Sequence, residues 1–124
     1  MKVLLSIKPE YAEKILSGSK LYEFRKALPK STEVKHCIIY ATMPVGRIVG
    51  EFEIGGYLSS SPEDLWMKTS DHSGITESFF REYFDGRDLA HAIEVKSVKR
   101  YKKSKLLNSV LPSGIPPQSF CYVN

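Results

Sequence analysis

The sequence of 124 residues is poor in the groups that build metal centres and disulfide frameworks. Its two cysteines, Cys37 and Cys121, each lie in an apolar, strand-like run without a Cys or His partner at metal-ligand spacing. The three histidines, His36, His72 and His91, are scattered along the chain. We therefore expect free thiols in a reducing compartment, no metal site and no cofactor.

Long apolar runs are also missing. No stretch approaches the roughly 20 apolar residues of a membrane span, and the apolar start at residues 1–7 is far too short for a signal peptide. Hydrophobic residues make up 42% of the chain, which suffices for an ordinary core, and we see no repeat or low-complexity tract. These features predict one globular domain over residues 1–124 in a cytoplasmic protein that does not contact membranes.

Acidic residues are absent from the last quarter of the chain. Residues 95–124 contain six Lys or Arg and no Asp or Glu, residues 1–35 contain eight against four, and residues 61–94 contain three against eight. A barrel that brings both ends together would gather positive charge on one side, which is typical of nucleic-acid binding. The alternative is that the lysines between Lys99 and Lys105 form only a solvated surface loop.

The order of local signals indicates a fold dominated by strands. Pro9 is well placed to begin a helix and Gly18 to end it, and Ser61 followed by Pro62 begins a second helical region. We expect strands at residues 2–7, 20–26, 36–42, 47–57, 89–98 and 119–123, helices at residues 9–17 and within residues 61–86, and a loop at residues 99–117. This order predicts an α+β fold, a small mixed β-barrel with helices after the first strand and in mid-chain, although an open α+β sheet fits the pattern too.

Aromatic residues recur at helical spacing in the second helical region. The residues that form this stripe are Ile75, Phe79, Phe80, Tyr83 and Phe84. Because their period is helical and their neighbours are acidic, we interpret them as core packing and not as a platform for stacking bases.

Residues 18–25 are the most informative segment. In a strand, Tyr22 and Phe24 share one face, while Glu23 and Arg25 project together from the other with Lys20 beside them. An aromatic pair on one face and an ionic group on the other suits a strand that lines a polar cleft. The alternation alone favours a solvated face with an ion pair.

The spacing G-x-K-x-x-E-x-R within this segment resembles the signature of the ASCH domain family, which comprises small β-barrels related to PUA domains. The motif residues here are Gly18, Lys20, Glu23 and Arg25. Residues 6–16 and 116–120 are also similar to the two ends of ASCH sequences. The resemblance implies a PUA-like fold with a cleft between the first helix and the barrel, lined by the Lys, Glu and Arg of the motif.

Further polar residues are expected to converge on this cleft. Lys8 precedes Pro9 at a helix start, where free N–H groups favour an anion, and Arg25 can grip a phosphate or carboxylate in a bidentate manner. The predicted binding set for RNA or a nucleotide is Lys8, Lys20, Glu23, Arg25, Tyr40, Gln118 and Ser119. The alternatives are a surface lysine at position 8, a core tyrosine at position 40 and a turn before the last strand.

The resemblance implies three functions, of which binding of single-stranded RNA in the basic cleft is preferred. The second is hydrolysis, with Lys20, Glu23 and Arg25 as catalytic residues. Some relatives resemble amidohydrolases of modified nucleosides, but Glu23 stands where their threonine nucleophile belongs. Others look like ribonucleases, and here Glu23 would be the general base while Lys20 or Arg25 stabilises the developing charge.

The third function is regulatory, because some ASCH relatives are described as transcription coactivator modules. The acidic helices within residues 61–86 would then contact a protein partner, with exposed acids such as Glu63 and Glu82 at the interface.

Overall fold

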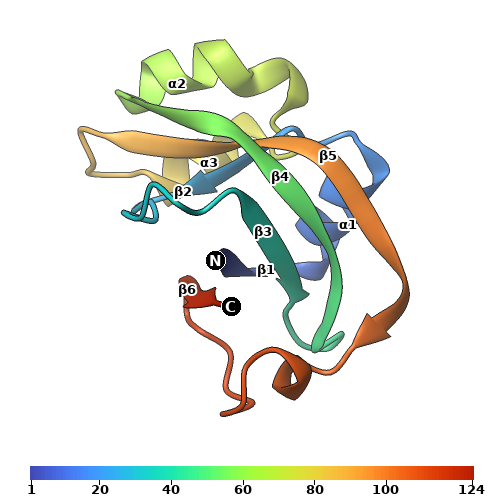
Figure 1. Ribbon diagram of the computed structural model, residues 1–124. Coiled ribbons are helices and arrows are strands. Elements are labelled where there is room, and N and C mark those ends of the chain that lie inside the picture. Colours follow the sequence, from blue (N-terminus) through green and yellow to red (C-terminus); the bar gives the residue numbers. More distant parts are fainter.

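The computed structural model describes residues 1–124 as one curled, six-stranded sheet flanked by helices (Figure 1). The elements are β1 (Lys2–Ile7), α1 (Pro9–Ser17), β2 (Tyr22–Arg25), β3 (His36–Ala41), β4 (Arg47–Ser60), α2 (Pro62–Thr69), η1 (Ser70–His72), α3 (Glu77–Tyr83), β5 (Ala90–Lys105), η2 (Leu107–Ser109) and β6 (Phe120–Val123). The strand order is β2-β5-β4-β3-β1-β6, and only the β1–β3 pair is parallel. The predicted α+β, barrel-like fold with helices after the first strand and in mid-chain is confirmed.

The first helix begins and ends where the sequence predicts. Lys8 is extended, with φ −58° and ψ 142°, and Pro9 occupies the first helical position. Gly18 has φ 90°, a left-handed conformation that glycine adopts without steric cost, and its N–H donates to the carbonyl of Ile15. The helix buries Ala12 and Ile15 against the sheet, which fixes the position of its first turn beside the end of β1.

The sheet is buried on both faces over much of its area, so that it separates three apolar clusters. The largest lies inside the curl under α1 and contains Val3, Leu5, Ile7, Ala12, Ile15, Val34, Cys37, Ile39, Ala41, Phe52 and Ile93. A second lies against the segment that follows β5 and contains Leu4, Ile38, Tyr40, Ile48, Leu107 and Val123. A third lies under α2 and α3 and contains Phe24, Leu65, Phe80, Phe84, Ala90 and Ala92.

Gly50 sets how closely α1 approaches the long β4–β5 ribbon. A Cβ atom at this position would lie 2.5 Å from the carbonyl oxygen of Lys99 and 2.7 Å from Cδ2 of Leu16. Only glycine fits this contact, which places the C-terminal part of α1 against the middle of β5.

Strand β5 is longer than predicted. The expected strand over residues 89–98 and loop from residue 99 onward are corrected by a strand that continues to Lys105, whose backbone pairs with Ile48 of β4. The side chains of this extension are mostly exposed and charged. This segment is a strand because its backbone pairs with β4, and its exposed side chains need not be apolar. It therefore shows none of the apolar alternation by which a strand is recognised in a sequence.

The two terminal strands lie side by side, as a barrel that brings both ends together requires. Lys2 to Leu5 pair with Val123 to Phe120 in antiparallel register. Helix α2 begins at the predicted cap, where the Ser61 hydroxyl accepts a hydrogen bond from the backbone N–H of Asp64 at 3.2 Å. None of the helices has the length and apolar character needed to cross a lipid bilayer.

Candidate functional site

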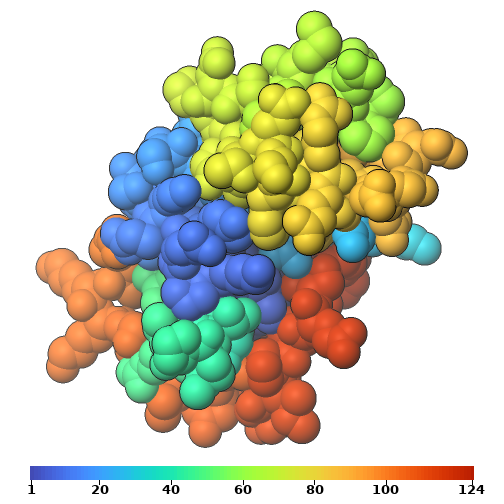
Figure 2. All heavy atoms as spheres, turned by 180° about the vertical axis from the view of Figure 1, so that it is seen from behind, coloured from blue at the N-terminus to red at the C-terminus, as the bar shows by residue number.

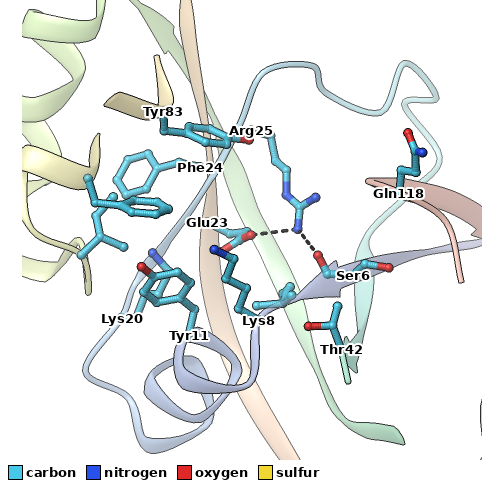
Figure 3. A pocket seen from close by; sticks show the side chains of 13 residues that line it. Ser6, Lys8, Tyr11, Lys20, Glu23, Phe24, Arg25, Thr42, Tyr83 and Gln118 are labelled. Atoms are coloured by element: carbon cyan, nitrogen blue, oxygen red, sulfur yellow. Dashed lines mark hydrogen bonds and ion pairs between the residues drawn. The ribbon is translucent and has the colours of Figure 1, made fainter. Parts of the chain in front are cut away.

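A pocket with a volume of about 360 Å³ opens between α1, β2 and α3 (Figure 3). Its wall consists of Ser6, Ile7, Lys8, Tyr11, Lys20, Glu23, Phe24, Arg25, Thr42, Ile75, Phe79, Tyr83 and Gln118. Seen from behind, the first 20 residues lie at the centre of this side of the molecule, next to the segment that includes α3 (Figure 2). The pocket therefore combines the ends of β1 and β3 with three segments that are far apart in the sequence.

Lys20 is buried in the wall of this pocket, with only 1% of its surface exposed. Its Nζ donates a hydrogen bond to the carbonyl of Ser73 at 2.6 Å and lies 4.8 Å from the centroid of the Phe24 ring and 5.5 Å from that of Tyr11. An ammonium group has three N–H donors, so two remain for a ligand or for the aromatic faces. The expectation of a solvated strand face is wrong for this lysine.

Burial changes the acidity of Lys20. Loss of hydration lowers the pKa of this ammonium to about 8, while the negative charge of Glu23 acts in the opposite direction. Lys20 is therefore mostly protonated at neutral pH but holds its proton far less tightly than an exposed lysine. A buried lysine with such a pKa in an open pocket is a candidate functional group.

The loop before α3 holds Lys20 in place. The segment from Ser70 to Ile75 crosses the lysine side chain, and the carbonyl of His72 accepts a hydrogen bond from the backbone N–H of Leu21 at 2.9 Å. Gly74 has φ +70°, and a Cβ atom there would lie 2.6 Å from the Lys20 side chain. Glycine thus permits both the left-handed backbone and the close contact with the lysine.

Glu23 and Arg25 project from the same face of β2, as the alternation predicts. Their side chains form an ion pair at 2.9 Å, with 7% and 6% of each residue exposed. Oε2 of Glu23 accepts the hydrogen bond from Arg25, and Oε1 has no hydrogen-bond partner in the protein. The carboxylate therefore keeps a free acceptor oxygen inside the pocket.

The guanidinium of Arg25 is occupied by the protein itself. Nη1 donates to both the carbonyl and the hydroxyl oxygen of Ser119, and Nη2 donates to the carbonyl of Ser6 and to Glu23. Only the Nε–H has no partner. The predicted bidentate grip of Arg25 on a phosphate is therefore corrected: both terminal nitrogens already donate two hydrogen bonds each, and one donor is left.

Aromatic side chains form one wall of the pocket, which the sequence interpretation missed. Phe80 and Phe84 pack into the apolar cluster under α3, as predicted, but Phe79 and Tyr83 line the pocket one residue earlier in each turn. The planes of these two rings are 11° apart, and the ring centroid of Tyr11 lies 5.6 Å from that of Phe79. The sequence carries a signal that could have found them: two adjacent aromatic stripes, Phe79 with Tyr83 and Phe80 with Phe84. One such stripe is enough to pack a helix on the core, so the second is available to line a pocket.

Lysines also lie at the mouth of the pocket. Nζ of Lys8 lies 5.4 Å from the centroid of the Phe79 ring, and Nζ of Lys26 lies 4.7 Å from that of Tyr83. Both lysines are exposed, as is Gln118, which reaches the pocket from the segment before β6. Of the predicted binding set, five residues line the pocket: Lys8, Lys20, Glu23, Arg25 and Gln118.

The other two members of the predicted set lie outside the pocket wall. Ser119 acts through Arg25. Its hydroxyl and carbonyl oxygens accept hydrogen bonds from Nη1 of Arg25 at 3.1 Å and 3.2 Å. Tyr40 packs in the cluster with Leu4 and Ile48 on the other side of the sheet. The structure thus corrects the placement of Tyr40, because this side chain points away from the face to which its neighbour Ile39 contributes.

The sequence also matches the model of a known protein family. The profile of the ASCH domain matches residues 5–99, which include the whole motif segment and three-quarters of the chain. The chain belongs to the ASCH domain family. The identification made from the motif residues Gly18, Lys20, Glu23 and Arg25 is thereby confirmed.

One relative matches this ASCH domain along nearly its full length. The chain is 27% identical over 124 residues to a protein of Zymomonas mobilis named ASCH domain-containing ribonuclease, which covers 98% of this chain and 84% of that protein. A crystal structure of ASCH from Zymomonas mobilis superimposes with a TM-score of 0.91 at 26% identity, over 99% of this chain and 87% of that one. This chain therefore shares its fold with that structure over nearly the whole of its own length.

The ASCH domain also resembles a segment of a longer protein. A protein of Ureaplasma parvum serovar 3 named ATP synthase subunit alpha is 32% identical over 123 residues, but the chain spans only 15% of its length. The similarity concerns that segment alone.

Proposed function

We propose that this ASCH domain binds single-stranded RNA and places one unpaired base or nucleotide in the pocket between α1, β2 and α3. The observation that carries the proposal is the burial of the Lys20 ammonium and the Glu23 carboxylate in an open pocket with an aromatic wall. Buried charges oppose folding unless they are fully paired, and here Lys20 and Glu23 each keep free hydrogen-bonding capacity. A base offers matching donors, acceptors and a flat apolar face.

The dimensions of the pocket favour a single nucleotide-sized group. Its volume of about 360 Å³ lies at the small end of the range for ligand pockets. The nearly parallel rings of Phe79 and Tyr83 give an apolar surface beside the charged groups. Aromatic rings of this kind stack on unpaired bases, a contact that contributes roughly 1–3 kcal/mol per base in single-strand binders.

RNA as the ligand is supported by the name of one relative that matches nearly the whole chain. The Zymomonas mobilis relative is named a ribonuclease, and this chain shares the fold of an ASCH structure from the same organism at a TM-score of 0.91. Lys8 and Lys26 at the mouth supply positive charge for the phosphates that flank a bound base.

Fluorescence anisotropy with a short single-stranded RNA and the matched DNA tests this proposal at two salt concentrations. Wild type should bind RNA with an affinity that falls as salt rises, and Lys20→Met should weaken binding by about tenfold, the cost of one charged hydrogen bond. Lys68→Met, which removes an exposed lysine of α2 outside the pocket, is the matched control. A folded wild-type protein that binds no RNA at low salt would refute the proposal.

The second candidate function is cleavage of the bound RNA. It is favoured by the name of the Zymomonas relative and by the pKa of Lys20, which burial lowers to about 8. In this mechanism, Glu23 accepts the proton of a ribose 2′-hydroxyl, and the ribose 2′-oxygen attacks the adjacent phosphorus. The bond between phosphorus and the 5′-oxygen then breaks, the leaving 5′-oxygen takes a proton from water, and Glu23 releases its proton to solvent, leaving a 2′,3′-cyclic phosphate.

The roles of the two cations differ in this candidate mechanism. Lys20 would stabilise the negative charge on the phosphorane, because its ammonium has free donors that face the pocket. Arg25 would orient Glu23, to which it donates at 2.9 Å. Chromatography of RNA after long incubation should show cyclic-phosphate ends with wild type and none with Glu23→Gln purified in the same way. Absence of any product with wild type would remove this function.

A regulatory role through a protein partner has less support from the geometry. On α2 and α3, the exposed acids Asp64 and Glu77 form ion pairs with Lys68 and Arg81 one turn later, at 3.8 Å and 2.8 Å. These pairs reduce the negative charge that the acidic helices present, and the partner interface stays a prediction.

A further inference from the structure

The far end of β5 contains a bulge. Between the pairs Gly50↔Arg100 and Ile48↔Lys105, strand β4 advances by two residues while β5 advances by five. The extra residues of β5 must arch away from the sheet because they have no partner across the ladder. Figure 2 shows the corresponding orange segment projecting from one side of the molecule. We call residues 99–105, which are the unpaired residues together with their paired flanks, the basic bulge.

The basic bulge is held in one conformation by contacts at both of its ends and at its middle. Arg100 grips the carboxylate of Glu13 in α1 with two hydrogen bonds, at 2.9 Å and 2.8 Å. The Tyr101 hydroxyl donates to Glu51 at 2.9 Å, and Arg47 donates to the hydroxyl and the carbonyl of Ser104 at 3.0 Å and 2.9 Å. A preorganised surface loses little entropy when it binds a partner.

Arg100 is neutralised by Glu13, but most of the lysines on the bulge have no ion-pair partner. Lys99, Lys102 and Lys103 are exposed and have no ion-pair partner. Of the two acids that contact the bulge, Glu13 pairs with Arg100, and Glu51 binds Tyr101 and Lys2, so neither pairs with these lysines. Residues 95–124 contain no acid. Lysines crowded on an ordered projection repel one another and add nothing to packing, so their concentration here indicates a polyanionic partner.

Helix α1 connects the basic bulge to the pocket. Lys8 and Tyr11 at its first turn line the pocket, while Glu13 in its middle holds Arg100. A helix of nine residues is about 14 Å long, so the bulge lies within a short distance of the pocket across this helix. In Figure 2 the first 20 residues lie between the segment that includes α3 and the projecting bulge, in agreement with the position of α1 between the pocket and the bulge.

We propose that the basic bulge binds the phosphate backbone of the RNA strand whose base occupies the pocket. The ligand is then a polynucleotide and not a free nucleoside, since a nucleoside in the pocket cannot reach the bulge. This inference rests on the proposed function for the location of the base, but it concerns a second surface with its own residues.

The test compares a bulge variant with a control of equal charge. Lys102→Gln combined with Lys103→Gln removes two positive charges from the bulge, and Lys30→Gln combined with Lys35→Gln removes two from exposed positions outside the bulge and the pocket. Binding of a single-stranded RNA of 12 nucleotides is measured by anisotropy over a range of salt, and binding of a mononucleotide by NMR titration. Circular dichroism confirms that each variant is folded.

The bulge variant should bind the RNA 12-mer about tenfold more weakly at low salt and bind the mononucleotide like wild type. The slope of log affinity against log salt should fall by about 1.4, because each lost phosphate contact on a single strand removes about 0.7. The control should lose less than threefold. Lys102→Arg with Lys103→Arg should restore wild-type affinity for the 12-mer.

Two results would overturn the proposal. The first is a bulge variant that binds the 12-mer as tightly as the charge control, while Lys20→Met still weakens binding; the pocket would then act without the bulge. The second is binding that depends on the bulge but is equal for RNA and a heparin fragment and unaffected by Lys20→Met. The bulge would then be a general polyanion surface, and the proposed function of the pocket would fail separately.

Discussion

Nη1 of Arg25 donates two hydrogen bonds to Ser119, to its carbonyl at 3.2 Å and to its hydroxyl at 3.1 Å. Arg25 belongs to β2 and Ser119 directly precedes β6, and these two strands are the opposite edges of the six-stranded sheet. One side chain therefore joins the two edges of an open barrel that no backbone ladder closes. The same guanidinium also pairs with Glu23, so the site and the closure of the fold depend on one residue.

Replacement of Arg25 should destabilise the protein strongly. Arg25→Ala leaves the Glu23 carboxylate buried without its partner and removes the Arg25 hydrogen bonds to the carbonyls of Ser6 and Ser119. Removal of one member of a buried ion pair costs about 3–5 kcal/mol, so the free energy of unfolding in urea should fall by that amount. Arg81→Ala removes an exposed pair with Glu77 and should cost under about 1 kcal/mol. Equal losses for the two variants would contradict the role of Arg25.

Phe79 and Phe80 are neighbours on α3 with separate roles. Phe80 is fully buried, and Phe80→Ala should cost about 3–5 kcal/mol of stability in thermal or urea unfolding. Phe79 lines the pocket and is half-buried, so Phe79→Ala should cost much less stability but weaken RNA binding by roughly 5- to 100-fold, through the loss of a stacking surface. If Phe79→Ala left the RNA affinity unchanged in a folded protein, the aromatic wall would have no part in binding.

Lys20 should make stability depend on pH in the alkaline range. Its pKa is about 8 in the folded protein, below the ordinary value of 10.5, so the unfolded chain binds more protons between these two values. The cost of burying the charge is fully present below pH 8 and disappears as pH rises toward 10.5. Between pH 7 and pH 10 the wild type should gain about 2 kcal/mol in free energy of unfolding relative to Lys20→Met. Parallel pH profiles for the two proteins would show that Lys20 is not buried as described.

The affinity for RNA should depend on the same proton. With a pKa of about 8, Lys20 is charged at pH 7 and mostly neutral at pH 9. Since the protonated form attracts an anionic ligand, the affinity of wild type for RNA should fall between pH 7 and pH 9, while that of Lys20→Met should change little. Anisotropy titrations at three pH values and constant ionic strength measure both. A wild-type affinity that stays constant over this range would exclude a role for the Lys20 charge in binding.

Much of the fold followed from signals that act over a few residues. Pro9 and Gly18 bounded α1 because their backbone preferences are local, and Ser61 began α2 through a hydrogen bond to Asp64 three residues away. The basic bulge could not be predicted in this way. Its strand character comes from pairing with Ile48 and Gly50, about fifty residues earlier in the chain, while its own side chains are charged and exposed.

The sequence alone determined the family and put Glu23 and Arg25 on one face of a strand, since a strand alternates its side chains whatever surrounds it. Tertiary structure decided what these groups can do. Lys20 became buried because Ser73 and Gly74, more than fifty residues later, close over it. The terminal nitrogens of Arg25 donate to Ser6, Glu23 and Ser119, which leaves only its Nε–H without a partner. Burial, pKa and spare hydrogen bonds depend on every segment that packs around a group, so they arise only when those segments meet.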